Sequence, residues 1–76
     1  MNNPTNPLKE NIRIDAIVEE ALPGSLFRLK TREGKEILGH LAGKMRMNHI
    51  RILLGDRVTV EMTPYDDKRG RIVRRL

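Results

Sequence analysis

The sequence predicts an all-β domain: a five-stranded barrel with one short helix between the third and fourth strands. Two observations lead to this prediction. Apolar and polar residues alternate in stretches separated by turn residues, and a period of two is typical of half-buried strands. The alternation stops between Gly43 and Asp56, where a short helical segment fits. A chain of 76 residues without cysteine builds one domain with a small core and no disulfide.

The first three predicted strands follow one another as a meander. The turn at residues 22–25 contains proline and glycine and ends the first strand. Phe27 and Leu29 mark the inner face of the second strand, and residues 36–41 supply the third. The apolar residues of the first strand fall at every second position: Ile12, Ile14, Ala16 and Val18.

The second half of the chain supplies the helix and two further strands. Residues 44–48 have neither period-two alternation nor proline, so we expect a short helical turn there. Pro64 ends the fourth strand, and residues 70–75 supply the fifth. The inner face of the fourth strand consists of Val58, Val60 and Met62.

Three strands, a short helix and two more strands are the plan of the OB-fold. This small Greek-key barrel binds oligonucleotides on the face of strands two and three and in the adjacent loops. We assign residues 12–76 to the OB-fold domain. Residues 1–11 are rich in Asn and Pro and have few apolar side chains to bury, so we expect a flexible N-terminal tail.

The positive charge lies entirely in the second half of the chain. Residues 1–42 carry six cations and six anions, whereas residues 43–76 carry nine cations and four anions. Seven of those nine cations are arginine, whose planar fork suits phosphate groups and base edges. This asymmetry is typical of a surface that faces a polyanion, and RNA fits better than anionic lipid.

Residues 43–56 combine positive charge with apolar side chains that can anchor the segment. The cations are Lys44, Arg46 and Arg51, and methionine, isoleucine and leucine lie between them. Taken alone, this pattern fits two interpretations equally well: a basic loop that inserts into RNA, or a helix that caps the barrel and leaves its cations in water.

Four phrases follow one another along the chain: Leu22-Pro23-x-x-x-Phe27-Arg28, Gly43-Lys44-Met45-Arg46, Ile50-Arg51-Ile52-Leu53-x-Gly55-Asp56 and Thr63-Pro64-Tyr65-Asp66. In this order and at this spacing they resemble bacterial translation initiation factor one, and the resemblance runs from about residue 12 to residue 75. Two positions depart from the family pattern: Met47 replaces a residue that is basic in some relatives, and Arg74 replaces one that is often aromatic.

The resemblance implies a cytoplasmic, monomeric factor that binds the small ribosomal subunit at the aminoacyl-tRNA (A) site. It would contact ribosomal RNA and a neighbouring ribosomal protein, block premature tRNA entry and cooperate with initiation factors two and three. In relatives the matching loop enters the minor groove of a ribosomal RNA helix. That groove is wide and shallow, so arginine and asparagine can reach it. The residues that we expect to contact RNA here are Lys44, Arg46, Asn48, His49 and Arg51.

The basic C-terminal run is harder to assign. In a regular strand Arg71, Val73 and Arg75 would share one face while Ile72 and Arg74 share the other, so the sequence does not say which arginines reach RNA. A solvated charge run is the simpler interpretation. Because they match family positions near the RNA, we expect contacts from Lys68, Arg69 and Arg71.

Other functions fit the sequence less well. A cold-shock-like RNA chaperone would need surface aromatic residues on strands two and three, where only Phe27 is available, and we expect Phe27 in the core and Tyr65 in a turn. A small ribosomal protein stays open on composition. We expect no enzyme, cofactor or metal site, because His40, His49 and the carboxylates show no catalytic or ligand spacing. No segment is apolar over a length that spans a bilayer.

Overall fold

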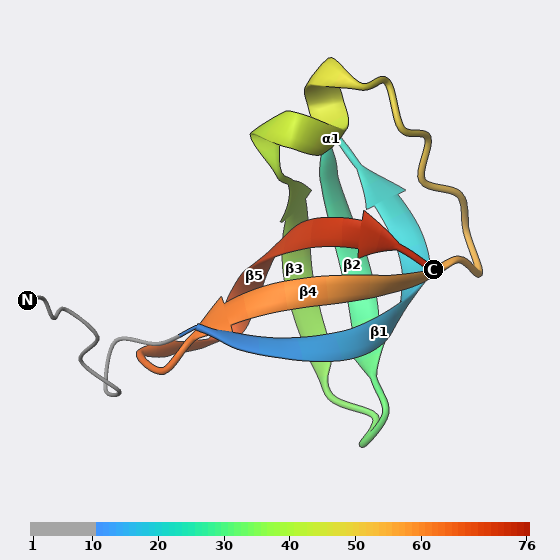
Figure 1. Ribbon diagram of the computed structural model, residues 1–76. Helices are drawn as coiled ribbons and strands as arrows, with labels where there is room; N and C mark the ends of the chain where they lie inside the picture. Colours follow the sequence, from blue (N-terminus) through green and yellow to red (C-terminus); the bar gives the residue numbers. More distant parts are fainter. Residues whose placement is uncertain (1–10) are drawn as a thin grey trace, which may run out of the picture.

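The computed structural model describes residues 11–76, which form a closed barrel of five strands. The predicted all-β OB-fold, with its short helix after the third strand, is confirmed. Around the barrel the strands follow the order β1-β2-β3-β5-β4, and all neighbours are antiparallel except β3 and β5. Figure 1 shows the helix beyond the end of β3, outside the barrel wall. The elements are β1 (Ile12–Leu22), β2 (Leu26–Thr31), β3 (Glu36–Leu41), α1 (Gly43–Met47), β4 (Arg57–Thr63) and β5 (Asp66–Arg75).

The alternation in the sequence sorts side chains between the core and the surface. Leu29, Val58, Val60 and Ile72 are wholly buried, because successive strand residues point to opposite faces and every inner face meets the others across the barrel. The predicted core positions on β2 and β4 are confirmed. Ile12, the first residue of β1, is half exposed. The apolar alternation of β1 therefore reaches the core only from Ile14, which packs against it.

One strand boundary agrees with the sequence pattern and one does not. β1 ends at Leu22, at the predicted turn, and a bulge between Val18 and Glu20 shifts its pairing with β2. β5 begins at Asp66 instead of residue 70. The run that follows Asp66 has no apolar alternation, and its pairing opposite Thr63 comes from the β4–β5 hairpin. Predicted boundaries therefore fail where pairing with a neighbour, and not burial, extends the strand.

A bulge in β5 decides the orientation of the C-terminal arginines. Val60 pairs with Ile72 but Thr59 pairs with Arg74, so Val73 is the extra residue. Ile72 stays buried, whereas Arg74 is exposed like Arg71. The regular alternation that would place Arg74 on the face of Ile72 is therefore wrong, because a bulge shifts the phase of the pleat by one residue.

Candidate nucleic-acid interface

The segment after β3 begins with the short helix α1, which ends in a Schellman motif. The Ile50 N–H donates to the Met45 carbonyl at 3.1 Å, and the His49 N–H donates to the Arg46 carbonyl at 3.2 Å. His49 itself has φ of 55°, the left-handed conformation that this motif requires and that glycine usually provides. The motif ends α1 at Met47 and leaves the His49 side chain exposed.

Two apolar residues anchor this segment on the barrel. Met45 and Ile52 are buried, whereas Met47 is 79% exposed. Of the two methionines in α1, only Met45 therefore anchors the segment, and Met47 lies exposed at the last position of the helix. The neighbouring leucines 53 and 54 are also exposed. The segment thus both caps the barrel and presents an exposed tip.

Hydrogen bonds fix the far end of the segment. The Gly55 N–H donates to the Val18 carbonyl at 2.8 Å, and the Leu53 N–H donates to the Asp56 carboxylate at 2.9 Å. The Arg75 guanidinium donates to the Arg51 carbonyl at 3.0 Å. Both ends of residues 43–56 are therefore held, so the cations between them project from a positioned loop.

Lys44, Arg46 and Arg51 are exposed and have no carboxylate within ion-pair distance among residues 11–76. Arg28 on β2 differs, because it pairs with Glu20 at 2.7 Å. An unpaired cation keeps its donors and its field available for an anion outside the protein. The structure therefore brings the loop residues of the sequence prediction together, with Asn48 and His49 between Arg46 and Arg51.

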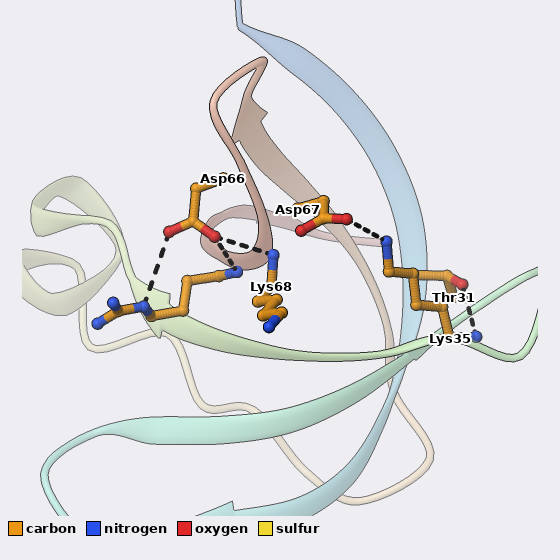
Figure 2. A network of polar contacts seen from close by, with 6 residues as sticks. Thr31, Lys35, Asp66, Asp67 and Lys68 are labelled. Atoms are coloured by element: carbon orange, nitrogen blue, oxygen red, sulfur yellow. Dashed lines mark hydrogen bonds and ion pairs between the residues drawn. The ribbon is translucent and has the colours of Figure 1, made fainter.

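The β4–β5 hairpin carries a second basic group. One oxygen of Asp66 accepts hydrogen bonds from the backbone N–H groups of Lys68, at 2.9 Å, and Arg69, at 3.2 Å. Figure 2 shows this turn together with the ion pair between Lys35 and Asp67, at 2.8 Å, which ties the hairpin to the β2–β3 turn. These contacts fix the backbone of the hairpin, while the Lys68 side chain stays exposed and unpaired within the described part of the chain.

Arg71 lies between the two basic groups and is held in place by a carboxylate. Glu61 accepts a hydrogen bond from the Arg71 guanidinium, and its carboxylate lies 3.5 Å from the Arg13 guanidinium. The hydrogen bond from Arg71 lowers the pKa of Glu61, and the positive charges of Arg71 and Arg13 lower it further against the opposing effect of burial. Glu61 is thus ionised at neutral pH, and it orients two arginines on the outer face of the barrel.

A groove connects the loop to β5. Its volume is about 530 Å³, and both Lys44 and Arg71 line it. Arg13 and Arg74 line it as well, and sequence reasoning did not assign either of them to the site. Their placement depends on the pairing of β1 with β4 and on the β5 bulge, which no motif in the sequence reports.

Aromatic side chains contribute little to this surface. Phe27 is buried on β2, as the sequence predicted, and Tyr65 is 75% exposed in the β4–β5 turn. These are the only two Phe, Tyr or Trp residues of the chain. A single-strand binder of the cold-shock type stacks bases on aromatic rings, and the outer face of β2 and β3 offers no Phe, Tyr or Trp ring for this.

Comparison with known proteins decides between these functions. The profile of the family described as "Translation initiation factor 1A / IF-1" matches residues 2–76. This chain belongs to that family. Its members are RNA-binding translation initiation factors that associate with the small ribosomal subunit, so the predicted family, RNA binding and role in initiation are confirmed.

Two solved structures resemble the chain. The solution structure of translation initiation factor one from the Wolbachia endosymbiont strain TRS of Brugia malayi is 43% identical with a TM-score of 0.75, covering 96% of this chain and 86% of that one. The crystal structure of YjeQ from Thermotoga maritima is 32% identical with a TM-score of 0.68 over 86% of this chain. The match spans only 23% of YjeQ, so this chain resembles one part of a larger protein.

Among residues 11–76, no helix has the length and apolar character to cross a membrane. Within the same range, no three histidine or carboxylate side chains lie together as metal ligands would.

Proposed function

We propose that this chain binds the A site of the small ribosomal subunit through ribosomal RNA during initiation and blocks premature entry of tRNA there. In this proposal it acts as a cytoplasmic monomer beside a neighbouring ribosomal protein, cooperates with initiation factors two and three, and works by binding without catalysis or a cofactor. The RNA contacts are Lys44, Arg46, Asn48, His49, Arg51, Lys68, Arg69 and Arg71.

The observation that carries the proposal is the anchored loop at residues 43–56. Its cations are exposed and unpaired in the described structure, and Met45 and Ile52 fix the loop on the barrel. An A-form RNA helix exposes 2′-hydroxyl groups and base edges in a shallow minor groove, and side chains that project from a fixed backbone can reach them. Placing these donors in advance reduces the entropy lost on binding.

His49 supplies a planar group at the exposed end of α1. We propose that it contacts one of two adenines that leave their helix when the factor binds. Extruding a base costs a few kcal/mol, and stacking on a planar side chain offsets about 1–3 kcal/mol of that cost per base. Phe27 is buried, and the exposed Tyr65 lies in the β4–β5 turn and not on this loop.

The test measures binding of two variants, Arg46→Ala and Arg51→Ala, to small ribosomal subunits. We expect each to weaken binding by roughly 1–3 kcal/mol while leaving the unfolding temperature unchanged, because both side chains are exposed. The matched control is Arg32→Ala, an exposed arginine in the β2–β3 turn, which should leave both quantities unchanged. Competition with tRNA for the A site on the same subunits reports where the factor binds.

Each failure has its own meaning. Early unfolding of the loop variants with normal binding once folded would make the segment a structural cap only. An equal loss with Arg32→Ala would indicate general charge attraction. Binding that does not compete with A-site tRNA would place the factor elsewhere on the subunit, and stable incorporation into subunits would indicate a ribosomal protein.

A further inference from the structure

The groove between α1 and the outer faces of β1, β4 and β5 is lined by arginines, Arg13 and Arg74, that are not among the RNA contacts proposed above. Four cations and no carboxylate line its volume of about 530 Å³. The cations come from β1, α1 and β5, which are far apart in sequence, so only the folded barrel assembles them. The lining consists of Arg13, Ala42, Gly43, Lys44, Thr59, Arg71, Val73 and Arg74.

The bulge in β5 places Arg74 in this groove. Thr59 pairs with Arg74 and Val60 with Ile72, which leaves Val73 as the extra residue between them. Without that extra residue, alternation would put Arg74 on the face of buried Ile72. Bulges commonly redirect a side chain near a functional site. Here the bulge adds an exposed arginine beside Lys44.

The carboxylates nearest the groove do not neutralise it. Glu61 is shared by Arg13 and Arg71, so a single negative charge serves two guanidinium groups. Each guanidinium has five N–H donors, and a carboxylate occupies only part of them. Lys44 and Arg74 have no ion-pair partner within residues 11–76. The groove therefore keeps a positive potential and free donors.

We propose that this groove binds phosphate groups along the backbone of an RNA strand, with Arg74 and Lys44 as the main contacts and Arg13 and Arg71 beside them. The Thr59 hydroxyl also lines the groove, but it donates to the Asp15 carboxylate at 3.5 Å, so the proposed contacts come from the cations. The lining has no aromatic side chain, so it recognises phosphate and not a base. Since Lys44 belongs to both the groove and the loop, the strand runs next to the loop contacts. This inference rests on the proposed function for the identity of the RNA.

The test compares Arg74→Gln and Arg74→Lys with the control Arg32→Gln in binding to small ribosomal subunits over a range of salt. Removing one phosphate contact makes the log–log salt slope less steep by about one and weakens binding. We expect this from Arg74→Gln, while Arg74→Lys and Arg32→Gln keep the wild-type slope. Thermal unfolding of each variant should be unchanged, because Arg74 is exposed.

A second arm asks whether the anion is RNA or a free phosphate. Inorganic phosphate is titrated into the wild-type protein while NMR follows the Arg74 side-chain N–H signal. We expect no saturable shift with inorganic phosphate and a saturable shift with added subunit RNA. Saturation by inorganic phosphate would overturn the assignment to RNA. A wild-type slope for Arg74→Gln, with Arg46→Ala still weak, would overturn the groove contact and leave the proposed function standing.

Discussion

At the scale of single residues, His49 combines a backbone requirement with a side-chain function. Its φ of 55° belongs to a region in which residues other than glycine are strained by contact of Cβ with the backbone. Glycine, the usual residue at this position of a Schellman motif, has no Cβ. A histidine here therefore lowers the stability of the loop. A contribution of its side chain to binding would account for its presence at this position.

The His49→Gly variant separates these two effects. We expect it to raise the free energy of unfolding by about 0.5–1 kcal/mol, because the strain is removed, and to weaken subunit binding, because the imidazole is lost. Urea unfolding and equilibrium binding measure the two. His49→Asn, which tolerates the left-handed conformation, is the control for stability. Unchanged binding of His49→Gly would show that the imidazole contacts no base.

Glu61 makes the stability of the barrel depend on pH. Its folded-state pKa lies below the ordinary value of 4.5 because Arg71 and Arg13 favour the ionised form. The stabilisation is therefore complete above pH 4.5 and is lost as the pH falls through the lower folded-state pKa. We expect Glu61→Gln to cost about 1 kcal/mol at pH 7, since the arginines are half exposed, and less at pH 3.

Urea unfolding at several pH values measures this difference. Glu33→Gln is the matched control, because Glu33 is exposed in a turn and forms no ion pair within residues 11–76. A difference between wild type and Glu61→Gln that stays constant down to pH 3 would mean that the ion pairs do not stabilise the fold.

At the scale of elements, the sequence correctly predicts those strand positions that are set by burial of apolar side chains. The apolar alternation of β4 identifies Val58 and Val60, and both are wholly buried. Helix α1 occupies Gly43–Met47, one residue from the expected range. Family positions in the sequence assign the Arg71 and Lys44 side chains to RNA. Their common groove follows from tertiary pairing, which alternation does not encode.

Arg13 and Arg74 could not be assigned to the site from the sequence, because strand pairing places both of them. Arg13 reaches the groove because β1 pairs with β4, and Arg74 because Val73 bulges out of β5. A bulge is a local change in pairing that leaves no pattern in polarity. Likewise, β5 begins at Asp66 through hairpin pairing, in a run with no apolar residue to mark it.

Strand β5 also contains a glycine that close packing requires. A Cβ on Gly70 would lie 2.5 Å from the Met62 sulfur, 2.5 Å from Val60 Cγ1 and 3.1 Å from the Glu61 carbonyl oxygen. Backbone and buried side chains cannot both move aside, so we expect Gly70→Ala to destabilise the barrel by about 1–3 kcal/mol. At Gly43 nothing lies within 4 Å of an added Cβ, and Gly43→Ala should unfold like wild type. Equal midpoints in urea would contradict this packing argument.

At the scale of the whole molecule, the fold neutralises most of the cations in one half of the chain and leaves the other half charged. Among residues 11–42, ion pairs hold every lysine and arginine except Arg32. In the second half of the described chain, only Arg69 and Arg71 form ion pairs. The unpaired cations of that half are Lys44, Arg46, Arg51, Arg57, Lys68, Arg74 and Arg75. The excess positive charge of this half therefore lies mostly on side chains that no carboxylate of the described chain pairs with.

This distribution predicts a steep dependence of subunit binding on salt. Each cation that neutralises a phosphate releases a condensed counterion, so about five engaged cations give a log–log slope on the order of −3 to −5. Binding isotherms at a series of potassium chloride concentrations measure the slope. A double variant, Arg46→Ala with Arg51→Ala, should make it less steep by about two if both arginines contact phosphate. If they contact base edges instead, affinity falls while the slope stays the same. A wild-type slope near zero would rule out the electrostatic account of binding altogether.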